Sequence, residues 1–60
     1  MNHNPYNLEV GERVILDAGY YNRTEVTIMY FTPEKMFAEV RNGNNHWKVM
    51  TYRLTPKIKT

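Results

Sequence analysis

The chain has 60 residues, no cysteine and a formal net charge of +2, which allows one domain and excludes disulfides and zinc sites built on thiolates. Its apolar fraction of 42% is typical of a globular protein rather than a disordered one. Serine and glutamine are also absent, so neither a serine nor a cysteine nucleophile is available. We therefore expect a small non-enzymatic domain that carries no cofactor.

The N-terminal stretch 1–9 is polar and contains no apolar run of the secretory type. No later apolar run approaches membrane-spanning length. We interpret residues 1–9 as a flexible arm, in which Tyr6 and Leu8 can anchor the chain across the end of a core, and residues 10–60 as one domain. A cytoplasmic protein with no membrane partner is the corresponding expectation.

The first two strands are expected at 12–16 and 24–32. Gly11 precedes the first, and its backbone freedom suits a sharp turn or bulge there. The second is nearly all β-branched or aromatic, which favours a strand. Alternation divides this second strand into two faces, Val26, Ile28 and Tyr30 on one and Thr27, Met29 and Phe31 on the other.

Three further strands are expected at 36–41, 46–51 and 55–58. A turn at Pro33-Glu34-Lys35 precedes the third strand. Asn42-Gly43-Asn44-Asn45 predicts a hairpin with a type I′ turn, and residues 52–54 suit one 3₁₀ turn. Eight side chains are expected to fill the interior: Val26, Ile28, Tyr30, Met36, Ala38, Val40, Val49 and Leu54.

Five short, closely spaced strands predict an all-β fold in a closed or nearly closed barrel, because closure removes exposed strand edges. Four stretches carry a resemblance to a known class: Val10-Gly11-Glu12-Arg13-Val14, Val26-Thr27-Ile28, Ala38-Glu39-Val40 and Leu54-Thr55-Pro56. Over residues 8–58 the chain resembles the SH3-like small barrels, among them KOW and Tudor-type domains. The resemblance implies a five-stranded SH3-like barrel, although Arg23-Thr24-Glu25 stands where KOW motifs usually have a glycine.

One enzyme class, the plasmid-borne type II dihydrofolate reductases, is also built from small SH3-like chains. The region from Gly11 to Val14 and the overall length look similar to it. Those enzymes carry a Val-Gln-Ile-Tyr strand in a central pore, whereas the corresponding stretch 47–52 reads Trp-Lys-Val-Met-Thr-Tyr. His3 and His46 stand at no recognisable metal-ligand spacing, and Asp17 is expected to cap a turn, so we expect neither enzyme activity nor a metal site.

Eight aromatic residues exceed the three or four that a barrel of this size can bury, so several must lie at the surface. Exposed aromatics can stack bases, enclose a methylated cation, form a protein interface, or cap the barrel ends. Our leading hypothesis is a binding or adaptor module with a protein partner. The expected binding surface comprises Tyr20, Tyr21, Arg23, Trp47 and Tyr52.

Charge is distributed unevenly along the chain. All six acidic residues fall within residues 1–40, and every charged residue in 41–60 is basic. Such asymmetry can mark a phosphate contact, or strand pairing can bring acids and bases together and cancel the field. The alternative hypothesis is therefore nucleic-acid binding through the basic C-terminal third. Its candidate residues are Arg41, Lys48, Arg53, Lys57 and Lys59.

Alternation also predicts an apolar outer surface, with Met29, Phe31 and Phe37 side by side on neighbouring strands. Burial of such a surface between two copies would add stability to a small domain. We expect a homodimer or a contact with another protein through this surface. A shift of one residue in register would turn the opposite face of the strand outward.

Overall fold

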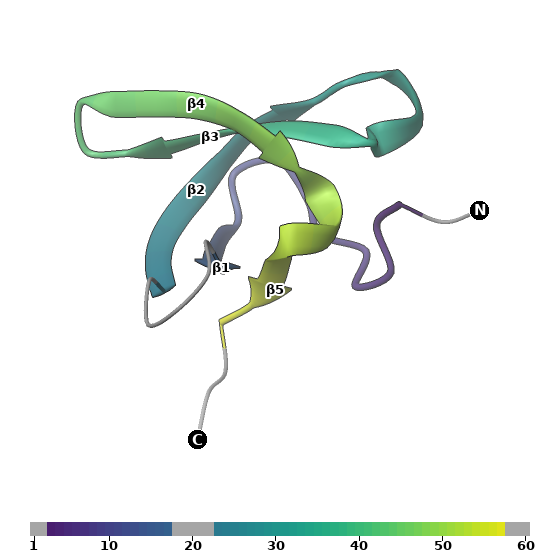
Figure 1. Ribbon diagram of the computed structural model, residues 1–60, viewed down its shortest axis with the longest axis horizontal. Helices are drawn as coiled ribbons and strands as arrows, with labels where there is room; N and C mark the ends of the chain where they lie inside the picture. Colours follow the sequence, from purple (N-terminus) through teal and green to yellow (C-terminus); the bar gives the residue numbers. More distant parts are fainter. Residues whose placement is uncertain (1–2, 18–22, 58–60) are drawn as a thin grey trace.

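The computed structural model describes residues 3–17 and 23–57 and shows one antiparallel sheet of five strands (Figure 1). The strands are β1 (Arg13–Asp17), β2 (Arg23–Phe31), β3 (Phe37–Asn42), β4 (Asn45–Met50) and β5 (Leu54–Pro56). The all-β prediction is confirmed, and each strand overlaps its expected range. Within the described ranges, no helix has the length and apolar character needed to cross a membrane.

The sheet has the order β4-β3-β2-β1-β5 and is open, since β4 and β5 are its two edges. The expected closure is therefore not seen. After β4 the chain enters one turn of 3₁₀ helix, η2 (Thr51–Arg53). The strand β5 that follows is only three residues long. Those three residues pair with β1, which leaves β4 at the opposite edge of the sheet (Figure 1).

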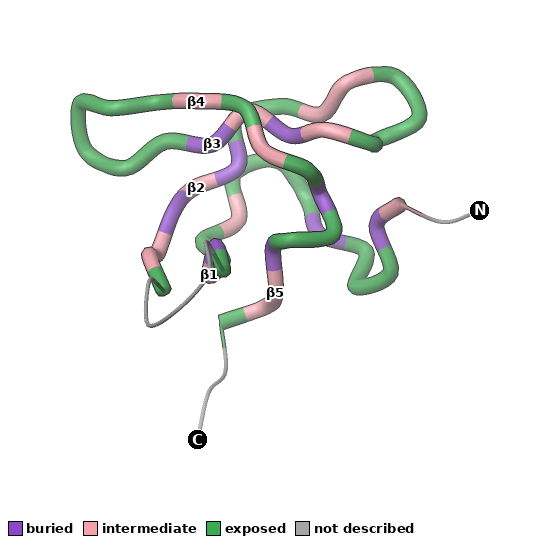
Figure 2. Tube along the Cα trace, viewed as in Figure 1, coloured by how far each residue is buried: buried purple, intermediate pink, exposed green. Residues whose placement is uncertain are grey.

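The core lies on the inner face of the curved sheet and is filled by alternate residues of the strands (Figure 2). Its buried apolar members are Leu8, Val14, Leu16, Val26, Ile28, Ala38, Val40 and Leu54. Leu8 comes from the stretch interpreted as an arm, and Asn4 holds it in place: Asn4 Nδ2 donates to Leu8 O at 2.9 Å, and Leu8 N donates to Asn4 Oδ1 at 3.0 Å. Residues 4–8 thus cover one end of the core.

A β-bulge at Met29 interrupts the alternation of β2. Ile28 pairs with Val40 and Tyr30 pairs with Glu39, so Met29 has no partner of its own on β3. The extra residue reverses the side-chain direction that follows it. Tyr30 is half exposed, and Phe31 packs against the core. Assigning Tyr30 to the interior and Phe31 to the outer face was therefore wrong.

The turn between β2 and β3 accounts for a second difference in the core. Met36 ends the 3₁₀ turn η1 (Pro33–Lys35) and is 40% exposed, because β3 begins only at Phe37. Its assignment to the interior was wrong as well. Thr32 closes the turn, since its hydroxyl donates to Phe37 O and accepts from Phe37 N.

The β3–β4 hairpin forms at the predicted place with a different turn. Asn42 pairs with Asn45, so Gly43 and Asn44 are the two central residues. Gly43 has a φ of +62°, and Asn44 is not among the residues with positive φ. Glycine with positive φ at the first central position is the pattern of type II′ rather than type I′.

Candidate binding surface

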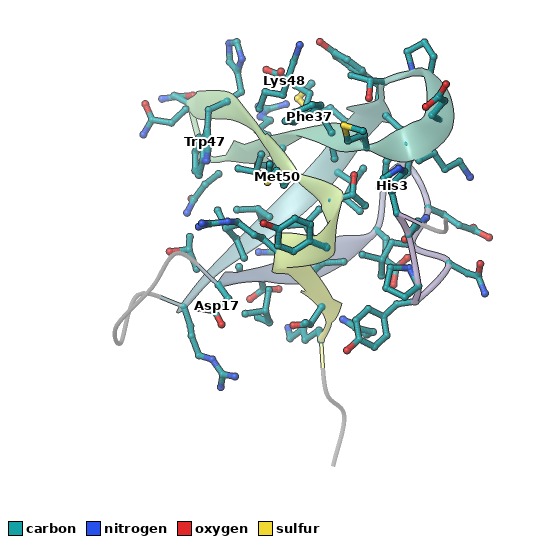
Figure 3. All side chains as sticks on the ribbon, turned by 45° about the vertical axis from the view of Figure 1, so that its right-hand side comes forward. His3, Asp17, Phe37, Trp47, Lys48 and Met50 are labelled. Carbon is teal, nitrogen blue, oxygen red and sulfur yellow. The ribbon has the colours of Figure 1, made fainter. Side chains whose placement is uncertain are left out.

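Four apolar side chains lie on the outer face of β2, β3 and β4, and we call them the outer patch: Met29, Tyr30, Phe37 and Met50. Met29, Tyr30 and Met50 are 41%, 50% and 38% exposed. Phe37 and Met50 are cross-strand partners, and Figure 3 shows both with Lys48 on this part of the sheet. Exposed apolar side chains on neighbouring strands are candidates for an interaction surface.

Local sequence explains why these side chains point outward. In β3 the buried Ala38 and Val40 take the inner positions, which directs Phe37 outward. In β4, Trp47 and Val49 pack against the core, so Met50 is directed outward by the same alternation. At the bulge, Tyr30 pairs with Glu39, Met29 is the inserted residue, and both Met29 and Tyr30 are exposed.

Charged side chains border the outer patch on one side. Glu39 pairs across the strands with Lys48, yet its carboxylate lies 2.8 Å from His46 Nδ1. Lys48 consequently has no ion-pair partner among the described residues. The Lys48 ammonium group therefore stands next to the apolar surface without an ion pair among the described residues, with Glu39 as its cross-strand neighbour.

The outer face becomes polar toward β1 and β5. Glu25 accepts contacts from Arg13 Nε at 2.9 Å and from Lys57 Nζ at 3.0 Å. The Lys57 hydrogen bond, followed by the Arg13 charge, lowers the pKa of the Glu25 carboxyl below its ordinary value. A shallow cleft of about 300 Å³ adjoins this group and is lined by Arg13, Glu25, Thr27, Arg41, Asn42 and Gly43.

The four described cations of the nucleic-acid hypothesis lie at different places on the molecule, and part of their charge is paired. Arg41 and Lys48 lie on the outer face, and Arg41 Nε donates to Gly43 O at 2.8 Å. Lys57 is paired with Glu25, and Arg53 lines a separate cleft. Lys59 lies outside the described residues. The ion pair between Lys57 and Glu25 thus neutralises part of the positive charge in residues 41–60.

The expected aromatic surface is also divided. Tyr20 and Tyr21 lie outside the described residues, and Arg23 is exposed at the start of β2. Trp47 is on the inner side of β4 (Figure 3). Tyr52, which is 61% exposed, lines a cleft of about 340 Å³ with Arg53, Asp17 and Thr55. The structure therefore does not bring Trp47 into the cleft that Tyr52 and Arg53 share.

Two members of the outer patch were missed by sequence reasoning. Met50 could have been found, because placing Trp47 and Val49 inside puts Met50 outside by simple alternation. Tyr30 could not have been found in the same way, since an inserted bulge residue has no signature in the composition of β2. Met29 and Phe37 stand on the outer face as expected, whereas Phe31 does not.

Within the part of the chain that the structure describes, no three histidine or acidic side chains are grouped as a metal site would require. Comparison with protein-family models, with curated proteins and with solved structures finds no match to this chain. The surfaces described above are therefore the basis for any statement about function.

Proposed function

We propose that this chain is a small binding module whose outer patch contacts another protein. The observation that carries the proposal is the exposure of Met29, Tyr30 and Met50 on one face of the sheet, with the half-buried Phe37 paired to Met50. Tyrosine, phenylalanine and methionine are enriched in the cores of protein interfaces. Contiguous exposed apolar patches commonly mark such interfaces on small domains.

The chemistry of the outer patch suits a protein partner. Thioether side chains are flexible and polarizable, so Met29 and Met50 can adapt to a partner's shape. Tyr30 adds a rigid ring together with a hydroxyl that forms hydrogen bonds. The Lys48 ammonium at the border favours a partner with negative charge opposite it and speeds the encounter of the two.

The proposal includes an SH3-like fold. Five antiparallel strands with one 3₁₀ turn between the last two are compatible with that class. A narrower assignment to KOW or Tudor-type domains receives no support from these features. A binding role fits the SH3-like assignment, because the chain offers an apolar surface and has neither a serine nor a cysteine nucleophile.

Single-stranded nucleic acid is a second candidate ligand, and one observation favours it. Tyr30 and Phe37 share the outer face with Lys48 and Arg41, so rings for base stacking lie near cations for phosphate. Nucleic-acid binding would weaken steeply with added salt. The pairing of Lys57 with Glu25 reduces the charge available for it, and for this reason we give the protein partner precedence.

A comparison of two tyrosine variants tests the proposal. Wild type, Tyr30→Glu and the control Tyr52→Glu would be immobilised, and native lysate proteins retained by each would be measured by quantitative mass spectrometry, with and without nuclease treatment. Both tyrosines are at least half exposed, so circular dichroism should show both variants folded. We expect nuclease-resistant partners that Tyr30→Glu loses and Tyr52→Glu retains.

The opposite pattern would transfer the function to the cleft beside Tyr52. Identical recovery by all three proteins would contradict binding through the outer patch. Recovery that disappears after nuclease treatment, combined with salt-sensitive binding of labelled single-stranded DNA, would replace the protein partner with nucleic acid.

A further inference from the structure

The two edges of the sheet differ in how they are protected. Strand β5 has three residues, of which Pro56 cannot donate a ladder hydrogen bond. Strand β4 has six residues, contains no proline, and has β3 as its one neighbour among the described strands. Proteins usually shorten or block an exposed edge because its unpaired backbone groups accept additional strands. The β4 edge has neither of these protections.

The backbone groups at this edge follow from the register of the hairpin. Thr51 N donates to Met36 O at 2.9 Å. Hydrogen-bonded residues alternate along an antiparallel pair, so Val49 and Trp47 also direct their backbone groups toward β3. The N–H and C=O groups of His46, Lys48 and Met50 therefore point away from β3, toward the open edge.

Side chains on both faces of β4 complement these free backbone groups. On the inner face, Trp47 and Val49 pack against the core but remain only partly buried. On the outer face, Lys48 has no ionic partner among the described residues, and Met50 belongs to the outer patch. Strand β4 itself contains no acidic residue. An added strand would meet two partly exposed apolar side chains on the inner face and, on the outer face, a cation with no ion pair among the described residues.

We propose that the β4 edge binds an extended segment of another protein as a sixth, antiparallel strand. The segment would carry a carboxylate opposite Lys48 and apolar residues on either side of it, which face inward over Trp47 and Val49. The inference rests on the protein-binding function proposed above and specifies the form of the partner. Main-chain bonds would supply affinity, and the alternate side chains would supply specificity.

A second copy of this chain fits the edge less well. Antiparallel self-pairing that uses the three edge-facing residues His46, Lys48 and Met50 of both copies joins His46 to Met50 and Lys48 to Lys48. That register places Lys48 opposite Lys48 of the second copy, and like charges directly opposite each other are destabilising. An acidic and apolar segment provides the charge that the edge lacks.

Fluorescence anisotropy with synthetic peptides tests the inference on the wild-type protein. The probe is a capped, labelled six-residue peptide in which a central glutamate is flanked by valines. In an antiparallel complex with the glutamate opposite Lys48, the glutamate N–H faces β4 and the valine N–H groups face away. We expect N-methylation of the glutamate to weaken binding about tenfold, because a donor is lost and its acceptor is left unpaired. N-methylation of the flanking valines should leave affinity within about threefold.

A charge exchange supplies an independent readout. Lys48→Glu should weaken binding of the glutamate peptide about tenfold, and a peptide with lysine in place of the glutamate should restore it to within about threefold. Since Lys48 is exposed, the variant should remain folded. Peptides with matched composition and scrambled order serve as controls.

Equal weakening by both kinds of N-methylation, or no saturable binding of the probe, would overturn the edge inference. A dimer in sedimentation equilibrium that the peptide does not dissociate would assign the edge to a second copy and would also overturn it. Failure here is separable from failure of the proposed function, because proteins lost specifically by Tyr30→Glu would still support the outer patch.

Discussion

The outer face of β2 has two halves of opposite character on either side of the bulge at Met29. Before the bulge, Glu25 is held between Arg13 and Lys57, and the surface is polar. After the bulge, Met29 and Tyr30 are exposed and adjoin the apolar part of β3 and β4. The same strand therefore presents a charged, solvated surface at one end and an exposed apolar surface at the other, and the proposed binding function rests on the second half.

Backbone geometry at the bulge explains why the outer face of β2 changes from polar to apolar within one or two residues. Gly11 N donates to Ile28 O at 2.7 Å, and Ile28 N donates to Glu12 O at 3.0 Å, so the backbone of Ile28 is held by the segment that leads into β1. The next residue, Met29, has no partner on β3. Two outward side chains in succession widen the apolar surface, and Phe31 then returns to the core.

Truncation of Phe31 should have the largest effect. Phe31→Ala removes a ring that packs on the core, and we expect a loss of about 2–3 kcal/mol in the free energy of unfolding, less than for full burial because Phe31 is only partly buried. Tyr30→Ala, its neighbour on the outer face, should lose less than about 1 kcal/mol. Urea denaturation measures both. Equal losses would mean that the bulge does not separate the two rings as described.

Removal of the buried hydroxyl of Thr51, in the turn η2, should raise the free energy of unfolding. Thr51 is 1% exposed, and its Oγ1 has no hydrogen-bond partner. Thr51→Val keeps the shape and removes the unpaired polar group, so we expect a gain of about 1–2 kcal/mol. Thr55→Val, at a partly exposed position on β5, serves as the control and should change stability by no more than about 0.5 kcal/mol. A loss of stability in Thr51→Val would indicate that the hydroxyl is satisfied.

Strand positions were predictable from sequence because they depend on local patterns. β-Branched residues in β2 and the Asn-Gly pair of the hairpin are signals that operate within a few residues. Side-chain direction after Ile28 was not predictable, because it depends on whether one residue is inserted relative to β3. Closure was not predictable either, since it depends on whether the two edge strands, β4 and β5, pair with each other.

The outer patch could be predicted only in part, because the bulge in β2 changes which side chains face outward. Met29 and Phe37 were placed on the outer face by alternation, and Met50 could have been. Tyr30 required knowledge of the bulge. The charge asymmetry of the chain left two interpretations open, and the pairing of Glu25 with Arg13 and Lys57 favours cancellation across strands at that point.

Relief of backbone strain in the turn η1, between β2 and β3, should raise the free energy of unfolding by a smaller amount. Glu34 and Lys35 both have positive φ, +69° and +59°, a region that residues other than glycine adopt at a cost. Glu34 is exposed, so Glu34→Gly removes that strain with little other change, and we expect a gain of about 0.5–1 kcal/mol in thermal or urea unfolding. Glu34→Ala, which keeps a Cβ, is the control and should show no gain. A gain of equal size in both variants would contradict strain as the cause.

The smallest effect should come from the polar half and should depend on pH. The Lys57 hydrogen bond and the Arg13 charge lower the pKa of Glu25 in the folded protein below the ordinary value of 4.5. The unfolded chain therefore binds a proton at Glu25 more readily than the folded chain does. The resulting stabilisation is fully present above pH 4.5 and disappears as pH falls through the lower pKa of the folded state.

Glu25→Gln removes this ionisation, so wild type should melt at a higher temperature than the variant near neutral pH, and the two should converge in acid. Exposed ion pairs are weak and screened, so 1 M salt should also reduce the difference. Glu34→Gln is the matched control, because Glu34 is exposed and forms no ion pair among the described residues. Thermal melts at a series of pH values from neutral to acid measure the effect. If the difference between wild type and Glu25→Gln stays constant across that series, the contribution of Glu25 is steric rather than ionic, and the two halves of β2 differ in shape rather than in charge.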